Sequence, residues 1–286
     1  MTVENAFNGA AMSGFLDDMA LSSAARVAQA RMHESTQALE RRARQTPAAA
    51  PLRLSVTGFD VVAELKLRSP AAGRLGHESQ DWLGRVAAYA RGGAAAVSVL
   101  TEPTRFDGSL EHLRAAAAAL SPLGVPAMRK DFLVDPYQVL EARAAGAGGV
   151  LVIIRMLQPA RIRELLDVAA EHGMFVLLEA FDAADLEVAR DLRKSRAGCQ
   201  ERILVGINSR DLQTLEVVQE RFAALSPLLP PDWPAVADSG VASAADACRM
   251  RNLGYRMALI GTALMAREDP VELLREIFAA ARTVQP

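Results

Sequence analysis

The chain has 286 residues, 51% of which are hydrophobic, and its formal net charge is -2. This length and composition allow one large buried core, so we expect a single domain. The small net charge provides no basic field for nucleic acid, and no apolar run reaches the roughly 18 residues that a membrane span needs. The first 21 residues lack a basic start and carry Asp17 and Asp18 in their most apolar part, which argues against a secretory signal. We therefore expect a cytoplasmic protein with no nucleic-acid or membrane partner.

The cysteines and histidines show no spacing typical of a metal site. Cys199 and Cys248 are isolated from each other, and the four histidines are scattered along the chain. We expect neither a disulfide framework nor a bound metal.

The first 60 residues differ in pattern from the rest. Residues Phe15 to Arg44 form a helical stretch of mixed charge, and Gln45 to Leu52 form a linker rich in alanine and proline. We therefore expect an N-terminal helical extension and linker over residues 1–52, followed by the main domain over 53–286. Two interpretations of the extension stay open: it closes the bottom of the domain, or it folds over a site at the opposite end.

Short apolar runs alternate with amphipathic helical segments from residue 61 onward, which is typical of repeated βα units. A representative helix is expected over Pro159 to His172, where apolar and charged residues fall on different sides. Eight strands with following helices predict a single (β/α)8 TIM barrel, since a doubly wound sheet would need a glycine-rich GxGxxG turn that is missing after the first strand. The eight runs are Val61 to Lys66, Ala95 to Thr101, Val125 to Lys130, Gly149 to Arg155, Met174 to Glu179, Arg202 to Asn208, Pro234 to Asp238 and Arg256 to Gly261.

The first predicted strand carries two opposite charges on one face. Glu64 and Lys66 are two residues apart, so their side chains point the same way. On a strand that is buried on both faces, such charges must be paired or used. Taken alone, the pattern fits a strand-end salt bridge before a Ser-Pro turn as well as it fits a functional site.

Polar residues also follow most of the other strands, at the carboxyl ends where active sites of such barrels form. Arg129 and Asp131 are equally compatible with ion pairs along the barrel wall. After strands seven and eight, glycine and hydroxyl residues stand where many barrels bind phosphate. The candidate residues at the strand ends are Glu64, Lys66, Arg129, Lys130, Asp131, Glu179, Asn208, Arg210, Asp238, Ser239, Gly240, Gly261 and Thr262.

Motifs in chain order resemble the indole-3-glycerol phosphate synthase family of tryptophan biosynthesis, from about Val61 to Pro270. They are Glu-x-Lys-x-x-Ser-Pro (64–70), Ser-Val-Leu-Thr-Glu (98–102), Phe-Asp-Gly-Ser (106–109), Arg-Lys-Asp-Phe (129–132), Asp-Pro-Tyr-Gln (135–138), Leu-Leu-Glu (177–179), Gly-Ile-Asn-Ser-Arg-Asp-Leu (206–212), Asp-Ser-Gly (238–240) and Ile-Gly-Thr-Ala-Leu-Met (260–265).

The resemblance implies conversion of 1-(2-carboxyphenylamino)-1-deoxy-D-ribulose 5-phosphate to indole-3-glycerol phosphate, with loss of carbon dioxide and water and without a cofactor. It implies Lys130 as the acid that protonates the carbonyl oxygen, and Lys66 as a second acid for the dehydration. Glu179 is implied as the base, and Glu64 as the electrostatic partner that orients the lysines and holds them charged. Asn208 would position the reacting hydroxyl.

The resemblance also implies the residues that hold the two ends of the substrate. Arg210 offers a planar fork for the substrate carboxylate. The aromatic ring would lie against Phe106, Phe132 and Leu151, and Arg68 is a possible extra charge for the phosphate. The phosphate would be held by Ser69, Ser239, Gly240, Gly261 and Thr262.

Three departures from the family pattern stand close to these residues. Asp238 replaces the usual glutamate, which predicts a weakened contact to the substrate. Ala71-Ala72 lacks polar groups in the loop that covers the site, and Ala180-Phe181 predicts a more apolar rim after Glu179.

Two alternative functions remain open on the sequence. One is a paralogous barrel enzyme of specialised metabolism that acts on another anthranilate-derived or phosphorylated compound. The other is a Schiff-base aldolase with Lys66 or Lys130 as nucleophile, which needs a lysine of depressed pKa. In each case the partner is a small phosphorylated substrate, and we expect a monomer or a weak homo-oligomer.

Overall fold

The structure is a computed structural model that describes residues 14–56, 58–69, 73–74, 81–196, 202–211, 214 and 216–282. For residues 69 and 74 it describes the backbone but not the side chain. Cys199 and the Ala71-Ala72 pair lie outside the described residues, so the expectations attached to them stay predictions.

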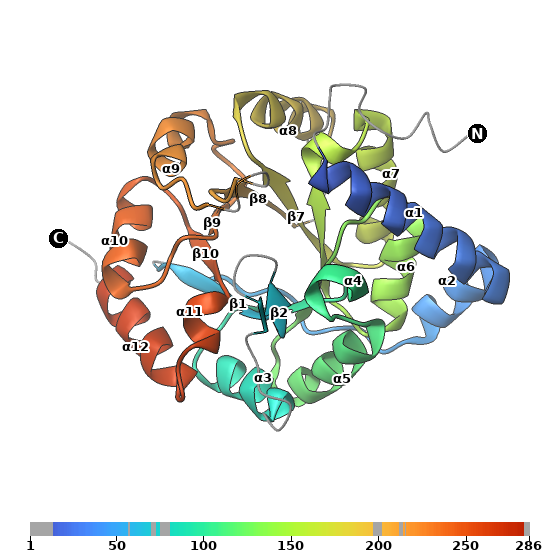
Figure 1. The fold of residues 1–286 in the computed structure, drawn as a ribbon, viewed down its shortest axis with the longest axis horizontal. Helices are drawn as coiled ribbons and strands as arrows, with labels where there is room; N and C mark the ends of the chain where they lie inside the picture. The colour runs from blue at the N-terminus through green and yellow to red at the C-terminus, as the bar shows by residue number, and fades with distance from the viewer. Residues whose placement is uncertain are drawn as a thin grey trace.

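Eight parallel strands form a closed barrel, which confirms the predicted fold (Figure 1). The strands are arranged around the barrel in the order in which they occur in the sequence, and β1 closes the ring by pairing with both β4 and β10. Each strand is shorter than, or shifted by one residue from, the predicted apolar run. The strands are β1 Asp60–Leu65, β4 Ala96–Leu100, β5 Ala127–Lys130, β6 Gly149–Ile153, β7 Phe175–Ala180, β8 Ile203–Asn208, β9 Ala235–Asp238 and β10 Met257–Ile260.

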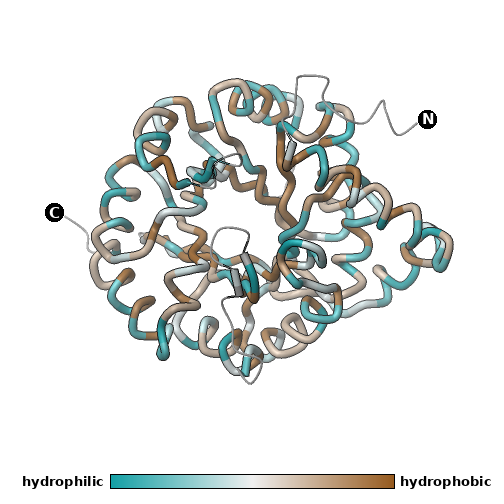
Figure 2. Tube along the Cα trace, in the orientation of Figure 1, coloured by the Kyte–Doolittle hydropathy of each residue, from teal (hydrophilic) through white to brown (hydrophobic). Residues whose placement is uncertain are grey.

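The barrel strands are buried on both faces, because side chains fill the interior and helices cover the exterior. Every residue of these strands is buried except Lys130, which is partly exposed at the carboxyl end of β5. Figure 2 shows the apolar strands in brown inside a ring of helices with hydrophilic outer faces. The charged residues on strand ends are therefore exceptions that need a physical reason.

The helices that follow the strands form the outer ring. Several begin with a capping aspartate or serine, and four of the helices described begin with proline, whose fixed φ suits the first helical position. The predicted helix from Pro159 ends one residue before the predicted end. The helices are α3 Trp82–Arg91, α4 Pro103–Phe106, α5 Leu110–Leu120, α6 Pro136–Ala144, α7 Pro159–Glu171, α8 Ala183–Ser195, α9 Glu220–Leu225, α10 Ala244–Asn252, α11 Thr262–Met265 and α12 Pro270–Ala281.

The N-terminal extension consists of two helices, α1 Phe15–His33 and α2 Thr36–Gln45. They separate at Ser35, whose hydroxyl accepts a hydrogen bond from the Ala38 N–H and so caps α2. Leu39 of α2 packs with residues of α6 in a small hydrophobic cluster, and Figure 1 shows both helices on the α6 side of the ring. The domain boundary at residue 52 stays a prediction.

A short antiparallel pair, β2 Arg68–Ser69 and β3 Gly73–Arg74, follows β1.

No helix in the described part of the chain is both long and apolar enough to cross a membrane.

Candidate active site

The carboxyl ends of the strands surround one cavity, and residues predicted from five different strand ends line it. Lys66, Lys130, Glu179 and Asn208 bring their side chains to this cavity from β1, β5, β7 and β8. The remaining lining residues are Phe15, Glu64, Leu100, Phe106, Asp131, Phe132, Leu151, Ile153, Arg210, Asp238 and Ser239.

Lys130 lies between two carboxylates that come from two other strands, β7 and β9. Its Nζ is 2.9 Å from Asp238 Oδ2 and 3.4 Å from Glu179 Oε2. Burial alone would lower the pKa of Lys130, but the carboxylates of Asp238, Glu179 and Glu64 together raise it above its ordinary value. The Lys130 side chain is therefore held as an ammonium ion that can donate a proton into the cavity.

Glu179 and Asp238 are hydrogen-bonded to each other, and their proton affinities differ. Burial, with a further contribution from the Asp238 charge, raises the pKa of Glu179 to about 8, although Lys130 opposes the shift. Asp238 shows the reverse balance, since Lys130 lowers its pKa despite burial. Asn208 is hydrogen-bonded to Glu179 and favours its ionised form. The pair provides one carboxylate that titrates near neutral pH and one that stays ionised.

Glu64 pairs with Lys66, as the sequence pattern allowed. Glu64 Oε1 is 2.9 Å from Lys66 Nζ, and the Glu64 side chain is buried. Its second oxygen, Oε2, is buried without a hydrogen-bond partner among the described residues. A buried carboxylate oxygen without a partner is costly, so it is available to a ligand group in the cavity.

Gly261 makes room for Glu64. A Cβ atom at this position would lie 2.5 Å from Glu64 Oε1, whereas the φ of Gly261 is -115° and does not itself require glycine. This close approach gives the glycine a structural reason that differs from the predicted contact to phosphate.

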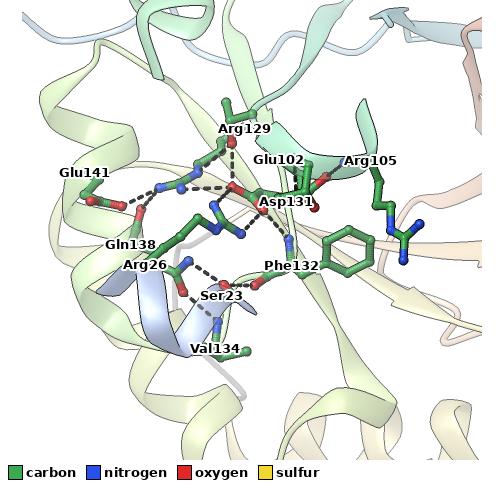
Figure 3. Close-up of polar contacts among 12 residues, drawn as sticks. Ser23, Arg26, Glu102, Arg105, Arg129, Asp131, Phe132, Val134, Gln138 and Glu141 are labelled. Carbon is green, nitrogen blue, oxygen red and sulfur yellow. Dashed lines mark hydrogen bonds and ion pairs between the residues drawn. The ribbon is translucent and has the colours of Figure 1, made fainter. Parts of the chain in front are cut away.

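Asp131, the residue that follows Lys130 in the chain, is the centre of a buried polar network (Figure 3). Its carboxylate accepts two hydrogen bonds from Arg26 of α1, at 2.8 and 2.9 Å, one from Thr101 and one from Arg129. These donors hold the pKa of Asp131 well below its usual range in spite of burial. Arg129 in turn donates to Glu141 Oε2 of α6. Of the two interpretations of Arg129 and Asp131, the ion pairs along the barrel wall are the ones observed.

The N-terminal helix contributes a wall of the cavity. The Phe15 ring meets the Phe132 ring edge to face at 5.8 Å, and Phe106 lies 6.2 Å from Phe132 on another side. Leu151 also lines this part, so the ring-pocket candidates lie together. Sequence reasoning missed Phe15, because nothing in local spacing connects it to a loop more than a hundred residues away. Its position places the start of α1 at the mouth of the barrel. The linker after α2 lies at the opposite end, where Arg202, just before β8, donates to the Leu52 carbonyl oxygen at 2.6 Å.

A second cavity adjoins the first and contains the predicted phosphate loops. Ser239, Gly240, Gly261 and Thr262 line it, together with Lys66 and Arg210. The Ser239 hydroxyl donates to Asp238 Oδ1 at 3.2 Å. The Ser69 side chain lies outside the described residues, and Arg68 is exposed, with Nη1 3.4 Å from Asp107 Oδ1.

Two departures from the family pattern can be located. Asp238 contacts the Lys130 ammonium, a role that the sequence did not assign to it. Ala180 and Phe181, which were expected to make the rim more apolar, are both buried, and the Arg155 guanidinium lies 4.5 Å from the centre of the Phe181 ring. Their effect on the rim stays a prediction.

Comparison of the folds shows the barrel in proteins of very different sequence. A 3-hexulose-6-phosphate synthase from Salmonella typhimurium matches with a TM-score of 0.58 at 13% identity, over 77% of this chain and 96% of that one. A thiamine phosphate pyrophosphorylase from Pyrococcus furiosus matches with a TM-score of 0.53 at 15% identity, over 77% and 94%. At such low identity these likenesses concern the fold alone.

Comparison of the sequences is more specific. Indole-3-glycerol phosphate synthase from a Nocardioides species is 43% identical over 77% of this chain and 80% of its own. The enzymes of that name from Leifsonia xyli and Bordetella pertussis are 44% and 42% identical, over 76% and 75% of this chain and 78% of their own. The family model described as indole-3-glycerol phosphate synthase matches residues 16–277. The chain belongs to the indole-3-glycerol phosphate synthase family, whose members are carboxy-lyases of tryptophan biosynthesis.

Proposed function

We propose that this chain forms indole-3-glycerol phosphate from 1-(2-carboxyphenylamino)-1-deoxy-D-ribulose 5-phosphate, with Lys130 as the principal acid and Glu179 as the base. The observation that carries the assignment of roles is the ammonium of Lys130, held between Asp238 and Glu179 at the mouth of the barrel. One group is charged and able to donate a proton, and its neighbour titrates near neutral pH.

The first part of the reaction forms the carbon-carbon bond. The ring carbon that carries the carboxylate attacks the ribulose carbonyl, and Lys130 gives a proton to the oxygen as negative charge develops there. The carboxylate then leaves as carbon dioxide, which restores the aromatic ring. Phe15, Phe106 and Phe132 enclose an apolar space suited to the ring during this step.

The second part removes water. An acid must protonate the new hydroxyl as it leaves, and a base must take the proton from the neighbouring carbon to complete the indole. Lys66, paired with Glu64, is our candidate for the acid, and Glu179 for the base. Asn208 is hydrogen-bonded to Glu179 and is the candidate for positioning the hydroxyl.

The ends of the substrate are assigned to the two sides of the cavity. Arg210 lines both the ring side and the loop side, and we assign it to the carboxylate. We assign the phosphate to the loops after β9 and β10, with Ser239, Gly240, Gly261 and Thr262, and retain Ser69 as a candidate from the sequence. A monomer or weak homo-oligomer and a cytoplasmic location remain predictions.

The environment of Lys130 counts against a Schiff-base aldolase. An amine nucleophile must lose its proton, whereas the surrounding carboxylates raise the pKa of Lys130. Treatment with borohydride in the presence of the substrate should therefore leave the protein unmodified, as measured by mass spectrometry.

The proposed reaction is tested by supplying the carboxyphenylamino-deoxyribulose phosphate to the wild-type protein and following indole fluorescence. We expect stoichiometric release of carbon dioxide with the indole product. Absence of the product, or faster turnover of another anthranilate-derived phosphate, would favour a paralogous enzyme instead.

A further inference from the structure

Two consecutive residues of the β9–α10 loop adopt left-handed backbone conformations. Ser239 has φ 66° and Gly240 has φ 76°. Glycine accepts this region readily, whereas serine adopts it only at a cost in strain. Something outside the loop must hold Ser239 in place.

The preceding loop holds both carbonyl groups of this pair. The Ser209 hydroxyl donates to the Ser239 carbonyl oxygen at 3.2 Å, and Gln219 Nε2 donates to the Gly240 carbonyl oxygen at 2.6 Å. Both donors belong to the segment between β8 and α9, which also carries Arg210. The packing is close, because a Cβ atom at Gly240 would lie 2.7 Å from Val217, 2.8 Å from Gln219 and 3.1 Å from Ser209.

The direction of these carbonyl groups fixes the direction of two backbone donors. A trans peptide is planar, so its N–H points opposite to its C=O. With the carbonyls of Ser239 and Gly240 tied to the β8–α9 segment, the N–H groups of Gly240 and Val241 point away from it. Within the described part of the chain, neither N–H has a hydrogen-bond partner. Successive free N–H groups of this kind are typical of an anion-binding concavity.

Gln219 is itself fixed from the other side. Its Oε1 accepts a hydrogen bond from Arg249 Nη2 at 3.1 Å, and Arg249 pairs with Asp246 at 2.8 Å. Asp246 Oδ2 accepts from the Ala242 N–H at 3.0 Å. Gln219, Arg249 and Asp246 therefore connect the carbonyl of Gly240 to the N–H of Ala242, and clamp the loop at both ends.

We propose that Gln219, assisted by Ser209, is a positioning residue that aims the N–H groups of Gly240 and Val241 at the substrate phosphate. The proposal rests on the proposed function, because it takes the cavity lined by these loops as the phosphate site. It adds the Val241 N–H as a direct donor and gives the β8–α9 segment a role at both ends of the substrate.

The test compares Gln219→Met with the wild type. Methionine keeps much of the length and volume of glutamine but removes both the donor to Gly240 and the acceptor for Arg249. Glu220→Gln, at the exposed neighbouring position, is the matched control. The measurements are kcat and KM for the substrate, the inhibition constant of inorganic phosphate, and the inhibition constant of anthranilate, which carries the ring and carboxylate but no phosphate.

We expect Gln219→Met to raise KM and the phosphate inhibition constant by about tenfold, because the contact to phosphate is made equally in the bound substrate and in the transition state. For the same reason, kcat and the anthranilate inhibition constant should change less than about twofold. Arg249→Met should show a smaller change in the same direction. The proposal is overturned if phosphate inhibition is unchanged, or if anthranilate binding weakens equally, because the variant would then disturb the whole mouth. Wild-type protein that is inhibited by phosphate but makes no indole product would overturn the proposed function and not this inference.

Discussion

Lys130 owes its charged state to carboxylates from two other strands, so its chemistry depends on Asp238 and Glu179 together. Asp238 is one methylene shorter than the glutamate usual in the family, yet its oxygen lies 2.9 Å from the ammonium. It also raises the pKa of Glu179 through its charge. The shorter side chain of Asp238 therefore still reaches the proposed acid.

The raised pKa of Glu179 predicts the direction in which activity changes with pH. A base works only when it is ionised, so kcat/KM of the wild type should rise with pH up to about 8. Asp238→Asn removes a negative charge beside Glu179 and should move this limb to lower pH, while kcat falls by about tenfold or more because Lys130 loses a partner.

Asp238→Glu is the matched control for that experiment. It retains the charge, so the limb should stay where it is in the wild type. A pH profile that is identical in the wild type and Asp238→Asn would show that Glu179 is not the titrating base.

Two explanations account for a glycine at position 261: it clears space for Glu64, or it lets the backbone contact the substrate phosphate. If it clears space for Glu64, Gly261→Ala should displace the Glu64 carboxylate from Lys66 and lower kcat by about 10- to 100-fold, with a smaller change in KM. Steady-state kinetics with the intact substrate measures both constants. A rise in KM at constant kcat would instead support the contact to phosphate predicted from the sequence.

Residue types at the site were readable from the sequence, but their contacts were not. Ordered motifs and strand ends identified Lys130, Glu179 and Asn208, because parallel strands of a barrel all end at one mouth. The partner of each charge depends on side-chain lengths across the barrel, which local sequence does not encode. The sequence therefore placed Asp238 at a strand end but did not predict its contact to Lys130.

At the scale of elements, helix α1 is joined to the segment that follows Lys130 by several separate contacts. Arg26 binds Asp131 with both terminal nitrogens, and the Ser23 hydroxyl donates to the Phe132 carbonyl oxygen while accepting from Gln138 (Figure 3). Because Asp131 directly follows Lys130, these contacts constrain the backbone that carries the proposed acid.

Arg26→Ala should therefore affect both stability and catalysis. Asp131 keeps Arg129 and Thr101 as donors, so we expect a loss of about 2 kcal/mol in the free energy of unfolding. We also expect kcat to fall by about tenfold as Lys130 becomes less well positioned. Urea unfolding and steady-state kinetics measure the two effects.

Arg31→Ala is the matched control on the same helix. Arg31 pairs with Asp135 at the surface, so its loss should cost less than about 1 kcal/mol and leave kcat unchanged. Equal losses of kcat in the two variants would show that general docking of α1, and not the contact to Asp131, is what matters.

The sequence could predict that an extension exists but not where it docks. The helical pattern of residues 15–44 was clear, and the break at Ser35 follows from the capping preference of serine. The partners of Ser23 and Arg26 lie more than one hundred residues away in sequence, so no local period identifies them. The open alternatives for the extension could be separated only by the tertiary structure.

At the scale of the whole molecule, the barrel was predictable because all eight strands are buried on both faces. Continuous apolar runs alternating with amphipathic helices leave few other architectures for one chain of this size. The charged strand ends then stand out against an apolar core, and they mark the mouth. The fold thus positions five strand ends around one cavity, where the proposed acid, the proposed base and their partners meet.

The central claim is that this barrel makes indole-3-glycerol phosphate with Lys130 as its principal acid. The most direct test is the rate of indole product formation by the wild type, Lys130→Met and a control variant, Lys194→Met, which alters an exposed lysine on α8. We predict that the wild type and Lys194→Met turn over equally, and that Lys130→Met loses activity by about a thousandfold while keeping its fold by circular dichroism. A folded Lys130→Met variant with a rate within about tenfold of the wild type would contradict the account.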